Sequence, residues 1–197
     1  MSTDRTVILE GVMTTLNEQG VVNIAPMGPI VDASMSRLIL RPFRTSNTYQ
    51  NLKATGQGVF HVTDDVLMLA RGAIRKLAAA PMRDTETIAG KLLTGACRAY
   101  EFEVSQLDDA QDRTHIDCQI VHVHHLRDFF GFNRAKHAVL EAAILATRLH
   151  LTGSTSALAE YEKLQIMVDK TGSDEEHQAM SELWDYVKTY NKGQPHD

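Results

Sequence analysis

The sequence predicts a mainly β protein with a helical C-terminal third, in which about six strands form a barrel or a strongly curved sheet. Three observations support this prediction. Residues 5–28 are rich in β-branched and apolar residues on both sides of an Asn-Glu-Gln-Gly turn. Two long segments, 96–107 and 112–130, alternate apolar and polar residues. After Asn133 the apolar residues recur at helical spacing, and Gly-Ser pairs separate the segments.

The individual elements follow in chain order. Residues 5–28 predict a β-hairpin, and Ser36–Phe43 a third strand that ends near Pro42. A short polar helix then ends at Gly56, and residues 58–65 predict a fourth strand. Residues 64–95 have a helix-favouring beginning followed by loop and short helix, and the two long strands come next.

Three helices are predicted in the remainder of the chain, at 134–151, 155–171 and 174–191. The predicted division is therefore a barrel domain over residues 1–132 and a helical segment over residues 133–197. We expect the helical segment to pack on the barrel or on a dimer partner, because its first helix has a face of small apolar residues.

Composition narrows the class of protein. The chain has 197 residues, 43% of them hydrophobic and 23% charged, which is typical of a folded domain. Its net charge of −5 argues against nucleic acid as the main partner. No apolar run approaches the roughly 18 residues that a membrane span needs. No export signal is visible, so we expect a cytoplasmic protein in which Cys97 and Cys118 are buried thiols.

The segment Arg41-Pro-Phe-Arg-Thr-Ser-Asn-Thr48 leads into the short helix. One capping residue would suffice there, yet four hydroxyl or amide residues stand in a row behind two arginines. Unpaired N–H groups at a helix N-terminus favour anions, and hydroxyls and arginines add further donors. The segment predicts either a phosphate site or a well-capped surface helix with solvated arginines.

A second segment, Val21-Val-Asn-Ile-Ala-Pro-Met-Gly-Pro-Ile30, ends the predicted hairpin. Proline cannot donate to a strand ladder and Gly28 permits close approach, so backbone groups are left exposed beside Met27. A flat heteroaromatic ring would find both hydrogen bonds and stacking surface there. The alternative is a simple strand exit.

The order of these segments resembles the FMN-binding split barrel of flavin reductases and pyridoxamine-phosphate oxidase relatives. The whole chain looks most like an uncharacterised prokaryotic family of such flavoproteins. The resemblance implies FMN as the cofactor and a homodimer with the flavin near the subunit interface. It also implies a set of cofactor-binding residues, in order along the chain: Ala25, Pro26, Met27 and Gly28 at the ring; Arg41, Pro42 and Phe43 along the ring and ribityl chain; Arg44, Thr45, Ser46 and Thr48 at the phosphate; and His61 and Thr63 near the same site. Asn133 is a further candidate, because it opens a helix immediately after a long strand.

The function that this resemblance implies is an FMN-dependent oxidoreductase, with hydride transfer to or from a small heteroaromatic or cofactor-like substrate. A pterin-type reductase is one such reaction. His61, His122 and Arg134 are the candidate catalytic residues. The alternative is a flavin-binding or redox-sensing protein without catalysis, and for Asn133 and Arg134 a helix start without a role in the site is equally open.

The histidines of the last strand allow a third function. Strict alternation from Thr114 onward places Ile120, His122 and His124 on one apolar face. Two imidazoles at i and i+2 can bind zinc or iron, but no third ligand follows at a recognisable spacing. The sequence therefore favours a hydrogen-bonded structural pair, and no metal site is predicted.

Overall fold

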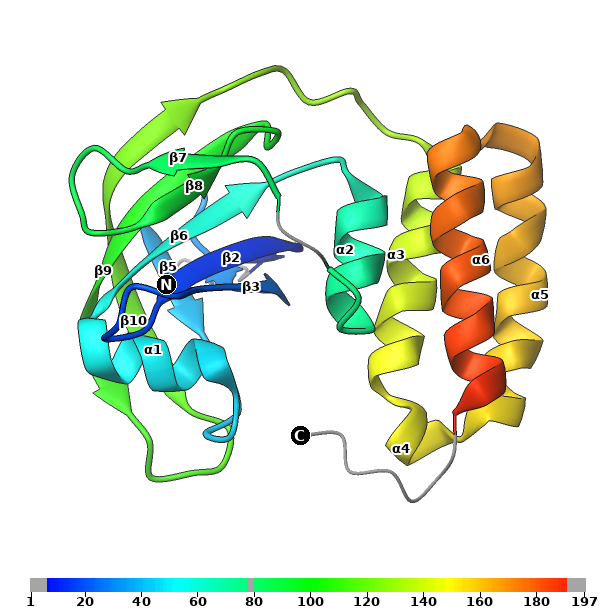
Figure 1. The fold of residues 1–197 in the computed structure, drawn as a ribbon, viewed down its shortest axis with the longest axis horizontal. Helices are drawn as coiled ribbons and strands as arrows, with labels where there is room; N and C mark the ends of the chain where they lie inside the picture. Colours follow the sequence, from blue (N-terminus) through cyan, green and yellow to red (C-terminus); the bar gives the residue numbers. More distant parts are fainter. Residues whose placement is uncertain (1–6, 78–79, 191–197) are drawn as a thin grey trace, which may run out of the picture. The chain divides into compact units, whose positions relative to one another are not determined.

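The computed structural model describes residues 7–77 and 80–190. The chain forms two compact units, residues 7–63 with 80–128 and residues 64–77 with 129–190. The first unit contains the sheets and helix α1, and the second contains the other helices (Figure 1). The predicted division at Asn133 placed residues 64–77 with the barrel, whereas the structure groups them with the C-terminal helices.

The first unit is built on an antiparallel sheet of eight strands in the order β1-β4-β5-β10-β9-β6-β2-β3, and a two-stranded sheet, β7-β8. The described strands are β1 (Val7–Ile8), β2 (Gly11–Leu16), β3 (Val22–Met27), β4 (Ile30–Val31), β5 (Arg37–Leu40), β6 (Gln57–Val62), β7 (Met82–Asp84), β8 (Lys91–Leu93), β9 (Arg98–Asp108) and β10 (His115–His125). The predicted β fold is confirmed, and the short strands β1 and β4 extend the sheet beyond the six strands expected.

The predicted hairpin is β2 and β3, which pair from Gly11 with Met27 to Leu16 with Val22. Asn17 fixes the turn, because its side-chain Oδ1 accepts hydrogen bonds from the N–H groups of Gln19 and Val21 at 3.0 and 2.8 Å. The β3 strand is at one edge of the sheet. An edge is where a proline such as Pro26 is tolerated, because no further strand needs its N–H.

Helix α1 (Asn47–Thr55) packs against β2 and β3 and contributes to the main core. It ends at Gly56, whose φ of 68° is in the left-handed region that glycine adopts without strain. The core combines Tyr49 and Leu52 of α1 with apolar residues of the sheet. Those sheet residues are Met13, Val31, Leu38, Leu40, Phe60, Tyr100, Phe102, Ile116 and Cys118.

Because β10 contains a β-bulge, His122 and His124 lie on the face opposite to the one predicted. Ile120 pairs with Phe102, but His122 already pairs with Glu101, so the register shifts between them. Directly opposed residues of an antiparallel pair project to the same face, and one extra residue reverses the faces beyond it. His122 therefore lies on the face of Glu101, opposite the core that contains Phe102. The strict alternation that placed Ile120 and His122 together was wrong.

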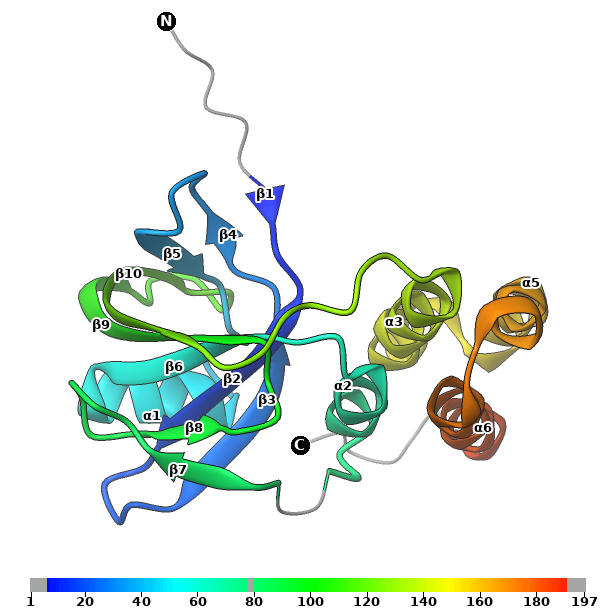
Figure 2. The ribbon, with the colours of Figure 1, turned by 90° about the horizontal axis from the view of Figure 1, so that it is seen from above.

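The second unit consists of helices α2 (Val66–Ala73), α3 (Arg134–Thr147), α4 (Leu149–Thr152), α5 (Ser154–Thr171) and α6 (Asp174–Thr189). Helices α2, α3, α5 and α6 pack together and are seen nearly end-on in Figure 2. Tyr161 is fully buried among them and donates to the carbonyl of Ala142 at 2.6 Å. Within the described chain, no helix combines the length and the apolar character needed to span a membrane.

Candidate functional sites

The N-terminus of α1 is closed by an ordinary cap. Ser46 Oγ accepts from the Tyr49 N–H at 3.2 Å and donates to the Phe43 carbonyl at 2.8 Å. The Ser46 carbonyl accepts the Gln50 N–H at 3.1 Å. The Ser46 hydroxyl is therefore occupied, while the N–H groups of the first two helical residues, Asn47 and Thr48, have no partner inside the helix.

Two buried hydrogen bonds fix α1 to the hairpin. Thr48 is buried, and its Oγ1 accepts from Asn23 Nδ2 of β3 at 3.1 Å. Asn51 Nδ2 donates to Thr15 Oγ1 of β2 at 3.0 Å. The Thr48 hydroxyl thus joins the helix to the sheet, and its predicted phosphate contact stays a prediction.

The residues just before α1 have side-chain hydrogen-bond donors that are available to a ligand. Thr45 is exposed, and its hydroxyl makes no hydrogen bond within the described residues. Arg44 is exposed as well, with the Asp109 carboxylate in its electrostatic range. Arg41 Nε is buried and has no hydrogen-bond partner among the described residues. An unpaired buried donor costs about 1–3 kcal/mol, so this atom indicates a missing acceptor.

The residues that follow β3 lead into β4, which pairs with β5. Strands β4 and β5 pair Ile30 with Ile39 and Val31 with Leu38, so the segment that follows β3 runs antiparallel to the strand that ends just before Arg41. A Cβ on Gly28 would lie 2.9 Å from a Glu10 carboxylate oxygen and 3.0 Å from Ile8, so the close approach at this glycine is made by its own chain. Met27 packs against the main core, and Ala25 and Pro26 are half-buried. The strand that follows the Val21–Ile30 motif is therefore the sheet neighbour of β5, which directly precedes Arg41.

The next two residues of the motif have different environments. Pro42 is buried, and its carbonyl accepts from the Thr114 N–H at 3.0 Å and the Thr114 hydroxyl at 2.8 Å. The Phe43 side chain is 59% exposed, and the Arg113 guanidinium lies 5.9 Å from its ring centroid. Phe43 thus supplies an accessible aromatic surface immediately before α1.

The remaining predicted site residues are engaged elsewhere. His61 is fully buried; its Nδ1 lies 3.1 Å from the Val12 carbonyl, and its Nε2 accepts the Leu93 N–H at 3.0 Å. Burial has the largest effect on the pKa of His61. The hydrogen bond to the Val12 carbonyl opposes this effect, the neighbouring His124 adds to it, and the pKa falls to about 4. His61 is therefore a neutral, fully bonded side chain that links β2, β6 and β8.

Asn133 caps α3 in the second unit. Its Oδ1 accepts from the Ala135 and Lys136 N–H groups at 2.8 and 3.1 Å, and its Nδ2 donates to the Thr171 carbonyl at 3.0 Å. Arg134 is exposed on the same helix, and Thr63 is buried at the end of the β6 segment. The roles predicted for these residues stay predictions.

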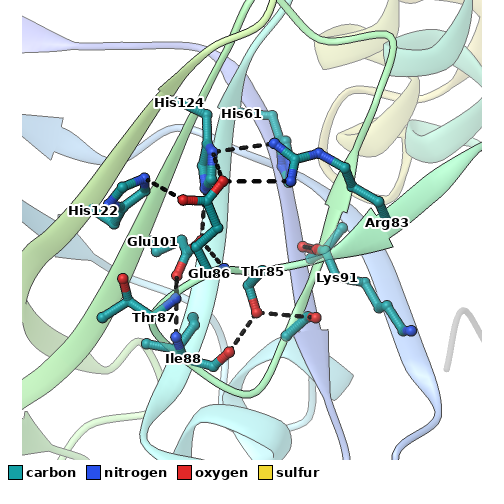
Figure 3. Close-up of polar contacts among 12 residues, drawn as sticks. His61, Arg83, Thr85, Glu86, Thr87, Ile88, Lys91, Glu101, His122 and His124 are labelled. Atoms are coloured by element: carbon teal, nitrogen blue, oxygen red, sulfur yellow. Dashed lines mark hydrogen bonds and ion pairs between the residues drawn. The ribbon is translucent and has the colours of Figure 1, made fainter.

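A second cluster of polar side chains lies on the face of β9 and β10 opposite the main core (Figure 3). At its centre Glu101 is fully buried. Its carboxylate accepts three successive backbone N–H groups of the β7–β8 loop, from Glu86 at 2.8 Å, Thr87 at 2.8 Å and Ile88 at 3.1 Å. One buried carboxylate therefore fixes this loop on the sheet.

The same carboxylate orients His124, whose Nε2 lies 2.6 Å from Glu101 Oε1. Burial raises the pKa of Glu101, but the hydrogen bonds from Glu86, His124, Thr87 and Ile88 outweigh it, so its pKa lies below the usual value. An ionised carboxylate only accepts, so His124 Nε2 carries the proton. Arg83 only donates, and its terminal nitrogen lies 3.3 Å from His124 Nδ1. Both contacts leave a lone pair on Nδ1.

Glu86 faces this lone pair from the loop. Its carboxylate oxygens lie 3.6 Å from His124 Nδ1 and 3.4 Å from His122 Nε2, and Arg83 lies 3.6 Å from it. The two imidazole rings are 4.5 Å apart, centroid to centroid. Sequence reasoning missed Glu86, Glu101 and Arg83, because only folding brings the β7–β8 loop beside β10. The one signal in the sequence for such a role was the position of Glu101 in a strand, between Tyr100 and Phe102.

Comparison with solved structures defines the class of fold. An FMN-bound protein from Methanosarcina mazei superposes with a TM-score of 0.80 at 24% identity, covering 93% of this chain and 96% of that one. Nitrilotriacetate monooxygenase component B from Mycobacterium thermoresistibile gives 0.52 at 14% identity, over 60% of this chain and 69% of that one. The styrene monooxygenase flavin reductase of Pseudomonas putida S12 gives 0.50 at 15% identity, over 60% and 80%. The chain thus has the flavin-reductase-like split-barrel fold, as the sequence predicted.

The family follows from the sequence profile. Residues 9–127 match "Protein of unknown function (DUF447) N-terminal domain", and residues 133–185 match "Protein of unknown function (DUF447)". The chain belongs to this DUF447 family. A comparison with curated proteins found no match.

Proposed function

We propose that this protein binds FMN where the β3 exit, the β5–α1 connection and the α1 N-terminus meet, and that it acts as an FMN-dependent oxidoreductase. The observation that carries the proposal is Arg41 Nε, a buried donor without a partner among the described residues, just after β5, the strand that pairs with β4. The FMN-bound state of the Methanosarcina mazei protein, which shares the fold, supports the same cofactor.

The phosphate of FMN fits the donors at the start of α1. The Thr45 hydroxyl is exposed, Arg44 adds a full positive charge, and the first helical N–H groups are unpaired within the helix. Ser46 serves this site indirectly, because its hydroxyl holds the helix start in place. The phosphate contacts therefore concentrate on Thr45, Arg44 and backbone N–H groups, and the Thr48 hydroxyl, which accepts from Asn23, keeps its own proton for a further contact.

The ring of FMN fits the end of β3. Because β3 is an edge strand, part of its backbone N–H and C=O groups face away from the sheet over Ala25–Gly28. Met27 adds apolar surface and Phe43 an exposed aromatic ring. FMN supplies hydride transfer at its N5 atom when bound, and the chain supplies orientation and hydrogen bonds to the ring.

The test compares Arg41→Gln with Arg37→Gln, a change four residues earlier to an exposed arginine that pairs with Asp117. Arg41→Gln should weaken FMN binding by about 1.5–3 kcal/mol in a fluorescence titration, the scale of a hydrogen bond to a charged group. Arg37→Gln should leave it unchanged. FMN affinity that is equal in both variants, or a protein that takes up no FMN, contradicts the proposed site.

Catalysis has a separate readout. A flavin-dependent oxidoreductase oxidises NADH or NADPH steadily when FMN and a pterin or free-flavin acceptor are supplied. A flavin-loaded protein that turns over none of these would instead be a binding or redox-sensing protein. We also propose a homodimer with the flavin near the subunit interface, the arrangement that the resemblance to FMN-binding split barrels implies. Light scattering of the FMN-loaded protein measures its mass directly.

A further inference from the structure

We propose that His122, His124 and Glu86 form a binding site for a divalent transition-metal ion of the zinc or ferrous-iron type. Each residue offers one ligand atom, and these atoms all lie within 4.8 Å of one another. Two imidazoles and one carboxylate are a ligand set that such ions favour.

The distances suit a single ion. Bonds of about 2.0–2.1 Å in a tetrahedral site place neighbouring ligand atoms about 3.3–3.4 Å apart. Glu86 Oε2 lies 3.4 Å from His122 Nε2, and Glu86 Oε1 lies 3.6 Å from His124 Nδ1, so each imidazole faces a different oxygen of the carboxylate. These separations are too long for strong hydrogen bonds, and the ligand atoms, which lie within 4.8 Å of one another, would draw closer around an ion.

The surroundings of His124 are those of a metal ligand. Its Nε2 faces the buried Glu101 carboxylate at 2.6 Å, which leaves Nδ1 as the electron-pair donor. A carboxylate behind a ligating imidazole fixes the tautomer and makes the imidazole more basic. Glu101 also holds the backbone of Glu86, Thr87 and Ile88, so one buried side chain positions two of the three ligands.

The charge of the cluster and its exposure to solvent also favour a bound cation. The cluster contains two carboxylates, Glu86 and Glu101, and one guanidinium, that of Arg83, which pairs with Glu86, so it has one negative charge in excess while the imidazoles are neutral. A divalent cation would compensate it. The side chains of Glu86 and His122 are 55% and 36% exposed, so a fourth coordination position is open to water or a small ligand. Arg83, itself 45% exposed, is the group that an incoming ion would displace.

The experiment uses the full chain, stripped of metal by a chelator and titrated with zinc, with metal content measured by mass spectrometry. The expected result is saturable binding of about one zinc per chain. His122→Gln and Glu86→Gln change partly exposed side chains, and each should weaken binding by more than the roughly 10–100-fold that loss of an outer-shell partner costs. The matched control is His125→Gln, which changes an exposed histidine of the same strand that contacts Asp128.

Arg83→Gln separates a metal site from a purely structural polar network. Removal of the competing cation should tighten zinc binding severalfold. Zinc binding that is weak and unsaturable, that is lost equally in His125→Gln, or that weakens in Arg83→Gln overturns the proposal. Cobalt(II) in place of zinc gives a second readout, because its visible spectrum reports nitrogen and oxygen ligation at low coordination number. FMN content should be the same in all these variants, so this proposal and the flavin proposal fail independently.

Discussion

The α1 N-terminus and the histidine–glutamate cluster differ in how their parts are distributed along the chain. The first, the proposed phosphate site, is one continuous segment, Arg41 to Thr48. The second combines the β7–β8 loop, β9 and β10, and depends on the register shift before His122. A site made of neighbours in sequence can be recognised from the sequence, whereas a site made by strand register cannot. The following predictions test that difference, from the largest expected effect to the smallest.

Glu101→Ala should have the largest effect, because the cluster rests on this one side chain. The change leaves three loop N–H groups and the His124 ring without their acceptor. We expect a loss of about 3–5 kcal/mol in the free energy of unfolding, measured by urea denaturation. Glu103→Ala, two residues along the same strand and exposed, should change it by less than about 0.5 kcal/mol. Equal effects would mean that the Glu101 network does not stabilise the fold.

Glu176 combines a local and a distant contact in one carboxylate. It accepts from Ser173 at the start of α6, at 2.8 Å from its N–H, and from Lys136 Nζ of α3 at 2.7 Å. Burial raises its pKa, but the hydrogen bonds from Lys136 and Ser173 outweigh this and lower the pKa from 4.5 to about 2. A lowered pKa means that the ionised form stabilises the folded state.

The stabilisation by Glu176 is therefore complete above about pH 4.5 and is lost as the pH falls toward 2. We expect a decrease on the order of 3 kcal/mol across that window, measured by denaturation at fixed pH values. Glu176→Gln should be less stable at neutral pH and should lack this part of the pH dependence. A variant with the same acid profile as the parent protein would show that other carboxylates dominate.

Thr45→Ala tests the proposed phosphate site at the start of α1. The Thr45 hydroxyl is exposed and makes no hydrogen bond in the part of the chain that the structure describes. Its removal should leave the melting temperature nearly unchanged and weaken FMN binding by about 1–3 kcal/mol in a titration. Unaltered affinity would remove Thr45 from the phosphate contacts.

Ser46→Ala should have the opposite pattern and the smallest effect. Loss of the cap costs about 1 kcal/mol of stability, because the Tyr49 N–H loses its acceptor. FMN affinity should fall less than in Thr45→Ala, since Ser46 acts only by holding the helix start. If Ser46→Ala weakens FMN binding more than Thr45→Ala does, the assignment of these two hydroxyls is reversed.

Several features could be predicted from the sequence because their causes are local. The hairpin of residues 11–27, the helix stop at Gly56 and the helices after Asn133 all follow from turn residues, caps and hydrophobic spacing. The faces of β10 could be predicted only as far as Ile120, because alternation assumes that no residue is inserted. The grouping of residues 64–77 with the C-terminal helices had no signal along the chain.

The sequence by itself determined the mainly β fold, its helical C-terminal segment and the run of hydroxyl and amide residues that leads into α1. Backbone preferences and hydrophobic periodicity act over a few residues, and a sequence displays them directly. Only the tertiary structure decided how each hydroxyl is used. Ser46 accepts from Tyr49 and donates to Phe43, whereas Thr48 accepts from Asn23 and keeps its own proton. The tertiary structure also decided that Glu86 meets two histidines, because a single bulge and one buried carboxylate set that encounter, and both depend on contacts between segments far apart in the chain.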